Sequence, residues 1–267
     1  MNLKSLGLIA LIVLASCKDN KTAETVVSVD YSEKELDVTT SIYPENVASI
    51  FAAHGGLDTW RSMQTLKFTM PRASGDETTT TDLHNRYSLI EMTNHTIGYD
   101  GENVWLNSKE DEAYKGNAKF YYNLMFYFYA MPFILADDGI VYQDVDPLLF
   151  EGIKYPGIKI SYESGVGESP DDEYILYYDS KTNEMVWLGY TVTYFSKQKE
   201  KEFHFIKYTD WQKINGLKLP KRLTWYEYKD NKPTTKRNDL DFTNVLITDS
   251  KNDASTFTKP KGAEVIN

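Results

Sequence analysis

The sequence predicts a mainly β protein of the α+β type, in which about eleven antiparallel strands form one curved sheet. A helix near the N-terminus and an apolar helix in mid-chain accompany the sheet. Segments rich in aromatic and branched side chains are joined by short turns, and short connections force antiparallel neighbours because parallel strands need long crossovers. A sheet of that size usually curls. The mid-chain exception is residues 118–131, which contain neither Gly nor Pro and suit a helix.

The N-terminus indicates export. Lys4 precedes the apolar run 6–14 (LGLIALIVL), which is too short to span a bilayer but suits a secretory signal. Small residues before Cys17 resemble the bacterial lipobox, in which the cysteine becomes the first mature residue and carries acyl chains. We therefore predict a lipoprotein signal peptide over residues 1–16 and lipidation of Cys17, the one cysteine of the chain. The alternative is an ordinary signal peptide with a chance cysteine.

The rest of the chain is predicted to be a polar tether and one domain. Residues 17–43 have few bulky apolar side chains and read as a linker between the acylated cysteine and the domain. No shift of composition divides residues 44–267, a length that one core can serve. The formal net charge of −10 argues against nucleic acid as a partner, because phosphates require a basic face. The expected location is the cell envelope, as an outer-membrane lipoprotein at the periplasmic face or the cell surface.

The domain is expected to start with a helix. Pro44 suits a first helical position, and Val47, Ile50 and Phe51 recur at helical spacing. The pair Gly55-Gly56 ends this helix. A second short helical turn is predicted over residues 57–63, with Trp60 as its apolar anchor.

Strands follow, with side chains alternating at a period of two. In residues 66–70 (LKFTM), the apolar residues share one face. Asp100-Gly101 is a strong signal for a tight hairpin within residues 96–108. The other predicted strand segments are 78–92, 173–180, 184–195, 201–212, 217–229 and 238–247.

The mid-chain helix is apolar on more than one side. Tyr121, Leu124 and Phe128 lie on one helical face, whereas Phe126 and Tyr129 lie on another. A helix of this kind is buried on several sides, and Pro132 ends it. The sheet can cover one side, so the other needs a second layer, a lid or a ligand. Both faces of strand 184–195 are also apolar, which fits either a thick core with surface tyrosines or a concave wall that protein does not fill.

Several short motifs carry a family resemblance, and these are HGGLDTW (54–60), HNRYSLIEM (84–92), YDGENVWLN (99–107), GLKLPKRL (216–223) and FTKPKGAEV (257–265). With the order of a lipidation signal, a helix, strands, an apolar helix and further strands, they resemble the LolA/LolB-like fold of lipoprotein-localisation carriers and receptors. HGGLDTW resembles uncharacterised outer-membrane lipoproteins of the same architecture.

This resemblance implies an eleven-stranded half-barrel closed by helices over an apolar, acyl-binding cavity. Arg86 falls where the carriers have an arginine that pins the lid, and Asp100, Gly101 and Trp105 fall in the family's hairpin. The soluble carrier is not lipid-anchored, whereas this chain has a lipidation signal. A receptor-like or storage-like role at one membrane therefore fits better than transfer between membranes.

Motifs for catalysis or metal binding are not found in the sequence. The four histidines lack metal-ligand spacing, and GVGESP (165–170) is neither a nucleophile elbow nor a phosphate loop. Carboxylates gather at Asp137-Asp138, at Asp144 and Asp146, and at residues 171–173. Such clusters could act as an acid–base pair or hold calcium, but they also suit solvated loops. We predict no catalytic residue, no metal site and no cofactor.

The leading hypothesis is a membrane-anchored, non-enzymatic lipoprotein that binds an acyl chain or a similar apolar ligand in its half-barrel. Its expected partners are that ligand, the membrane through Cys17, and an envelope protein. The alternative is an envelope scaffold, or a glycan- or protein-binding lipoprotein, whose cavity its own side chains fill. A minor alternative is a hydrolase that uses the loop carboxylates. The predicted cavity wall consists of Trp60, Phe68, Trp105, Phe126, Phe128, Tyr129, Met131 and Trp187.

Overall fold

The structure, a computed structural model, describes residues 42–109, 113–162, 172–196, 198, 200 and 202–266. The predicted signal peptide, the lipidation site Cys17 and the tether as far as residue 41 lie outside the described residues, as do residues 165–171 with the GVGESP segment. Within the part that is described, no helix combines the length and the apolar character needed to cross a membrane.

Two short helices open the domain, as predicted. Helix α1 (Glu45–Ala53) buries Val47, Ile50 and Phe51, and helix α2 (Leu57–Ser62) buries Trp60. Gly55 between them has a positive φ of 107°, and a Cβ there would lie 2.3 Å from the carbonyl oxygen of Gly216. Glycine is therefore required for the close approach of this loop to the hairpin that contains Gly216.

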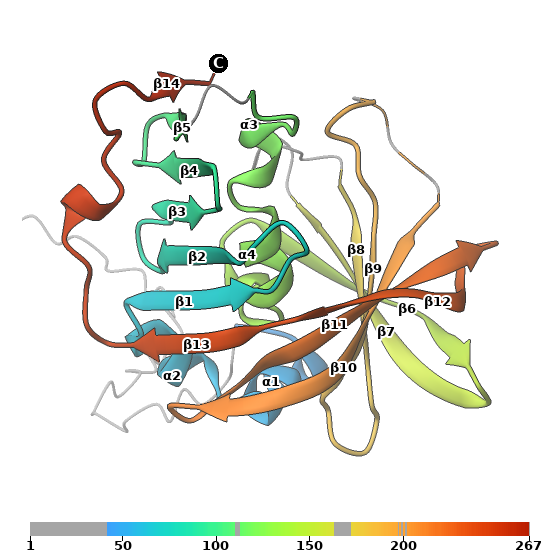
Figure 1. The fold of residues 1–267 in the computed structure, drawn as a ribbon. Helices are drawn as coiled ribbons and strands as arrows, with labels where there is room; N and C mark the ends of the chain where they lie inside the picture. Colours follow the sequence, from blue (N-terminus) through green and yellow to red (C-terminus); the bar gives the residue numbers. More distant parts are fainter. Residues whose placement is uncertain are drawn as a thin grey trace, which may run out of the picture. The chain divides into compact units, whose positions relative to one another are not determined.

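The strands form two antiparallel sheets of seven strands each, in which a first meander, a helical segment and a second meander follow one another (Figure 1). Sheet A has the order β13-β1-β2-β3-β4-β5-β14 and sheet B the order β12-β11-β10-β9-β8-β7-β6. The strands of sheet A are β1 (Thr65–Met70), β2 (Glu77–Asp82), β3 (Ser88–Glu91), β4 (His95–Tyr99), β5 (Val104–Ser108), β13 (Thr243–Thr248) and β14 (Glu264–Val265). Those of sheet B are β6 (Ile140–Phe150), β7 (Ile153–Tyr162), β8 (Tyr174–Tyr178), β9 (Met185–Tyr190), β10 (His204–Ile214), β11 (Leu217–Lys229) and β12 (Lys232–Asp241).

The mainly β, antiparallel half-barrel is confirmed, but the division of its strands differs from the prediction. Instead of one sheet of about eleven strands, the described residues form fourteen strands in two sheets. The missed strands include β6, whose Asp144 and Asp146 are exposed. Strand β6 is the edge of sheet B, and edge strands carry charges and proline on a solvated face. Its sequence therefore resembles a loop.

The mid-chain segment is not one helix. It consists of α3 (Ala118–Tyr121), α4 (Leu124–Tyr129) and the 3-10 helix η1 (Phe133–Ala136). The side-chain oxygen of Asn117 accepts a hydrogen bond from the backbone N–H of Phe120 at 2.9 Å, so Asn117 caps α3. We call residues 118–137, which include the C-cap residue Asp137 of η1, the lid segment. A second 3-10 helix, η2 (Ala254–Thr256), lies near the C-terminus.

The lid segment packs between the two sheets, and α3 and α4 are seen beside sheet A in Figure 1. The Tyr129 ring stacks on Phe68 of sheet A with centroids 4.4 Å apart. The Phe128 ring contacts Tyr190 of sheet B at 5.0 Å. The Tyr208 hydroxyl donates to the carbonyl oxygen of Phe128 at 2.6 Å. An apolar segment with two buried sides is therefore explained by two covering sheets.

Candidate ligand-binding site

A cleft of about 360 Å³ opens at the edge of the lid segment, between α2, the turn that joins β2 to β3, and η1. Its floor is apolar, because the Trp60 and Phe133 rings stack with centroids 4.8 Å apart and an angle of 7°. The volume falls within the range of about 300–1,000 Å³ that is common for small-molecule sites. The lining residues are Leu57, Trp60, Arg61, Met63, Leu83, His84, Arg86, Phe133, Ala136 and Asp137.

The β2–β3 turn places Arg86 at the rim of this cleft. The Asp82 carboxylate accepts hydrogen bonds from the backbone N–H groups of His84 and Asn85 at 3.0 and 2.8 Å. Although burial raises the pKa of Asp82, these hydrogen bonds hold it below its ordinary value. Arg86 itself has φ 61°, in the left-handed region that a non-glycine residue rarely adopts. The Asp82 carboxylate thus orders the turn that holds Arg86 at the rim of the cleft.

Arg86 contacts the lid segment at two points. Its Nη2 donates to both carboxylate oxygens of Asp137, at 2.7 and 2.9 Å, and its guanidinium lies 5.1 Å from the centroid of the Phe126 ring. The Arg86 and Asp137 side chains are 32% and 42% exposed, so this pair is worth no more than about 1 kcal/mol. The contact has the geometry of a lid-pinning pair. That Arg86 controls the lid remains a prediction.

Among the described residues, the interior between the sheets is packed with side chains, whereas a half-empty hollow was expected. A small void between α1, η1 and sheet B measures about 10 Å³, and Ile50, Leu135 and Ile160 are among the residues that line it. Such a void holds about one water molecule and no acyl chain. The side chains of the lid segment occupy the space instead. Access of a long apolar ligand to the interior would therefore require the lid segment to move.

The structure brings together six of the eight residues predicted to form the cavity wall. Trp60, Phe68, Phe126, Phe128, Tyr129 and Met131 all belong to the main buried core. Among these six, Trp60 also lines the cleft. Contact of any of them with a ligand stays a prediction.

Trp105 and Trp187 lie elsewhere. Trp105 is on the outer face of sheet A, where its Nε1 donates to the carbonyl oxygen of Phe257 at 3.0 Å. Trp187 packs in a separate aromatic cluster, with its ring centroid 4.7 Å from that of Phe150. In the pairing of β8 with β9, Tyr177 faces Trp187 and Tyr178 faces Met185, so Val186 is an extra residue. Such a bulge changes which side chains share a face, and simple alternation therefore misplaces Trp187.

Sequence reasoning missed most of the residues that line the cleft, such as Met63, Leu83, Phe133 and Asp137. Two of the motifs behind the family resemblance nevertheless meet there. HGGLDTW contributes Leu57 and Trp60, and HNRYSLIEM contributes His84 and Arg86. These two motifs, to which no structural role had been assigned, were the sequence signal that could have located the cleft. Their meeting depends on tertiary contacts that periodicity does not report.

The predicted carboxylate clusters do not converge on a common site within the described residues. Asp144 accepts a hydrogen bond from Asn46 Nδ2 at 2.9 Å. Asp172 accepts hydrogen bonds from the backbone and the hydroxyl of Thr193, and Glu173 pairs with Lys159 at 2.8 Å. Of the described residues that line the cleft, one, Asp137, is a carboxylate. The described members of these clusters therefore have separate partners.

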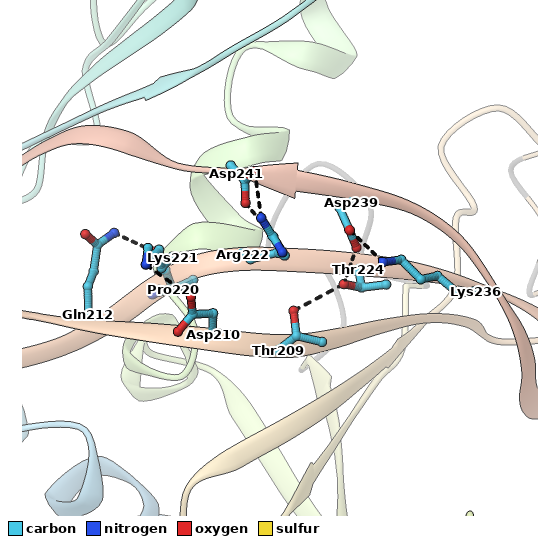
Figure 2. Close-up of polar contacts among 10 residues, drawn as sticks. All are labelled: Thr209, Asp210, Gln212, Pro220, Lys221, Arg222, Thr224, Lys236, Asp239 and Asp241. Atoms are coloured by element: carbon cyan, nitrogen blue, oxygen red, sulfur yellow. Dashed lines mark hydrogen bonds and ion pairs between the residues drawn. The ribbon is translucent and has the colours of Figure 1, made fainter.

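A separate polar network crosses strands β10, β11 and β12 on the outer face of sheet B (Figure 2). Arg222 Nε lies 2.5 Å from a carboxylate oxygen of Asp241, and Lys236 Nζ lies 2.6 Å from one of Asp239. Asp239 also accepts from the Thr224 hydroxyl at 2.7 Å. The acids shown in the network are matched by lysine or arginine. These contacts serve to join neighbouring strands on a solvated face.

A protein-family model, described as a family of unknown function (DUF6503), matches residues 68–240. No curated protein matches the chain. Among solved structures, a LolA-superfamily protein from Nitrosomonas europaea has 9% identity and a TM-score of 0.47, covering 79% of this chain and 96% of its own. A DUF1329-family protein from Desulfovibrio piger has 13% identity and a TM-score of 0.46, covering 76% and 93%.

A putative outer-membrane lipoprotein-sorting domain from Vibrio parahaemolyticus has 6% identity and a TM-score of 0.38, covering 72% of this chain and 92% of its own. The LolA superfamily is the one that the sequence motifs resemble. The family model spans well over half of the 267 residues. The chain therefore belongs to DUF6503, a family of unknown function.

Proposed function

We propose that this protein is a membrane-tethered, non-enzymatic lipoprotein of the bacterial envelope that holds an acyl chain or a similar apolar ligand. The tether is the segment that follows acylated Cys17. The observation that carries the proposal is the cleft at the edge of the lid segment, which combines a stacked aromatic floor with a charged rim. A floor of this kind suits a hydrocarbon chain, and a charged rim suits the part of an amphiphile that stays in water.

The cleft supplies part of the affinity for an apolar chain. Each buried methylene group contributes about 0.8 kcal/mol. Half a dozen such groups would thus contribute on the order of 5 kcal/mol, which the costs of association largely offset, so useful affinity requires further contacts. Deeper insertion would gain more, but it requires displacement of the lid segment from the filled interior. The contact of Arg86 with Asp137 at the end of the lid segment is partly exposed and therefore weak, so it would oppose such a displacement only slightly.

A cleft-filling variant tests the proposal directly. Ala136 lines the cleft, and Ala136→Trp should occupy the space and weaken binding of a fluorescent fatty acid at least tenfold. Ala52→Trp is the matched control, because Ala52 is exposed on α1. Native mass spectrometry of protein extracted from its membrane should also show a bound lipid. A ligand-free chain whose Tm is unchanged by fatty acids or lipids would refute the proposal.

A second candidate is an envelope lipoprotein that binds a glycan or a protein while its interior stays filled. The filled interior favours it, as does a cluster of three rings. Phe195 is 64% exposed, and its centroid lies 4.9 Å from Phe120 and 5.1 Å from Tyr194. A hollow of about 330 Å³ beside the cluster includes Asn117 and Lys119, which can bind hydroxyl groups. Saccharide binding that is lost in Phe195→Ser and kept in Ala136→Trp would select this candidate.

A further inference from the structure

The two walls that face the lid segment differ in polarity. In sheet A, Leu66, Phe68 and Met70 of β1 belong to the main core. They pair across the sheet with Thr81, Thr79 and Glu77 of β2, in that order. Directly paired residues lie on the same face, so these three polar residues also face the lid segment. We call Glu77, Thr79 and Thr81 the β2 stripe.

The middle of the β2 stripe has unmet hydrogen-bonding capacity. Thr79 and Thr81 are each 1% exposed, and their hydroxyl oxygens make no hydrogen bond to any described group of the protein. Neighbouring polar groups are satisfied, since Glu77 accepts from the Tyr121 hydroxyl at 2.6 Å and Ser88 donates to the carbonyl oxygen of Tyr122 at 3.2 Å. A buried hydroxyl without a partner destabilises a fold. The two threonine hydroxyls therefore suit hydrogen bonding to a bound ligand, because the lid segment supplies no partner for them.

A second pocket reaches the Thr81 end of the stripe. It has a volume of about 160 Å³, and its lining is mostly polar. Arg86 lines both this pocket and the apolar cleft, so the two spaces flank one side chain. Arg86 Nη1 is buried and makes no hydrogen bond to a described group. The lining consists of Thr81, Asn85, Arg86, Tyr99, Tyr122, Asn123, Phe126 and Tyr127.

Charge indicates what kind of group would fit. The positive charge of Arg86 is already matched by Asp137, whose carboxylate oxygens both bind Nη2. Among the described residues that line the polar pocket, Arg86 is the one that carries a charge. An incoming anion would therefore find no unmatched cation in this pocket, and it would be repelled by the Asp137 carboxylate. An uncharged oxygen, such as an ester carbonyl or a hydroxyl, can take up the remaining donors without that repulsion.

We propose that Thr79 and Thr81 of the β2 stripe, together with Arg86, bind the uncharged, oxygen-bearing head of an amphiphile whose apolar tail occupies the cleft. The ligand class is an acyl ester or an acylated polyol, as opposed to a free fatty acid or a plain hydrocarbon. This inference rests on the proposed function, because it names the chemistry of the ligand that the cleft holds. It assigns the specificity for that ligand to Thr79, Thr81 and Arg86 Nη1.

The experiment compares four probes of equal chain length: a fatty-acid methyl ester, a fatty alcohol, the free fatty acid and the terminal alkene. Displacement of a fluorescent apolar probe gives the affinity of each. The wild-type protein should bind the ester or the alcohol at least tenfold more tightly than the alkene and the fatty acid. Whichever of the ester and the alcohol binds more tightly then shows whether the site recognises a carbonyl or a hydroxyl group.

Isosteric variants locate the preference. Thr81→Val and Thr79→Val should remove the preference for the oxygen-bearing probe, leave the affinity for the alkene unchanged, and raise the Tm of the ligand-free protein by about 2–4 °C. Thr81→Ser keeps the hydroxyl and should keep the preference. Thr80→Val is the matched control, because Thr80 lies on the same strand but on its opposite face.

Four results would overturn the inference. One is an unchanged preference in both valine variants. Another is tightest binding of the free fatty acid, which would replace the uncharged head by an anion. If all four probes bind equally and Ala136→Trp removes binding, the inference fails while the proposed function stands. If none of the probes binds, the proposed function fails with it.

Discussion

Two side-chain attachments of the lid segment, one near each of its ends, differ chiefly in their burial. At one end, the Tyr121 hydroxyl donates to Glu77, which is 6% exposed, and Arg72 Nε lies 3.7 Å from the same carboxylate. At the other end, Arg86 and Asp137 form a two-fold contact at 2.7 and 2.9 Å, but their side chains are 32% and 42% exposed. Water competes for the second contact and not for the first. Burial, and not the number of hydrogen bonds, should therefore decide which end is held more firmly.

The largest effect on the free energy of unfolding is expected in the middle of the lid segment, where aromatic packing holds it. Tyr129 is fully buried against Phe68 and Phe242. Tyr129→Ala should lower the free energy of unfolding by about 3–5 kcal/mol, because it leaves a cavity between the lid segment and sheet A. Urea unfolding measures this, with Phe195→Ala as the exposed control, expected within about 0.5 kcal/mol. A loss below about 1 kcal/mol for Tyr129→Ala would show that the lid segment does not contribute to the core.

The buried attachment should be next in size. Tyr121→Phe removes one hydrogen bond to a buried carboxylate, a loss of about 1.5–3 kcal/mol in the free energy of unfolding. Tyr99→Phe is the matched control, because the Tyr99 hydroxyl donates to the exposed carbonyl of Gly101 and its loss should matter little. Equal effects of the two substitutions in urea unfolding would contradict the comparison.

The pH dependence of stability gives a further test of the buried attachment, through the titration of Glu77. Burial raises the pKa of Glu77, opposed by the hydrogen bond from Tyr121 and by Arg72. The folded protein thus holds this proton to higher pH than the unfolded chain does. The Glu77 contribution to stability therefore falls as pH rises from the ordinary pKa of 4.5 through the pKa of the folded state, and it stays low above that pKa.

Glu77→Gln should remove this dependence while it keeps an acceptor for Tyr121. Measured as a difference from the wild-type protein, the stability of the variant should rise with pH over that window and then level off. Glu91→Gln, an exposed position on β3, should show no such difference. A Glu77→Gln difference that is flat from pH 4 to 8 would mean that the folded structure does not perturb this carboxyl.

The smallest effect is expected at the exposed attachment. Asp137→Asn should change the free energy of unfolding by no more than about 1 kcal/mol, and about 1 M salt should abolish most of the difference. Urea unfolding at low and high salt tests both statements, with Asp138→Asn as the neighbouring control. A loss above about 2 kcal/mol that resists salt would place Arg86 and Asp137 among the principal attachments of the lid segment.

Local features of the fold were predictable because their causes are local. Asp100-Gly101 indicated a hairpin, and there the Asp100 carboxylate accepts from the backbone N–H groups of Glu102 and Asn103 at 3.0 and 2.8 Å. The first helix and its end at Gly55-Gly56 were likewise readable from spacing and glycine. The edge strand β6 was missed because its exposed, charged face lacks the alternation that marks a half-buried strand.

The candidate site was much less predictable. The cleft draws residues from α2, from the β2–β3 turn and from η1, and no short-range pattern reports how those three meet. The filling of the interior is equally a tertiary result, because composition shows that a helix is apolar but not what covers it. The β2 stripe was also overlooked, since threonine suits a strand whether or not its hydroxyl faces a core.

Neighbouring residues set the alternation of the strands, the start of the first helix, the Asn117 cap and the apolar character of residues 118–131, so these features can be read along the chain. Long-range contacts set the filling of the interior by the lid segment, the separate positions of Trp105 and Trp187, and the place of Arg86 between an apolar cleft and a polar pocket. The reason is that sheet twist, a bulge at Val186 and long-range packing set which faces meet, and these act between segments that are distant in the chain.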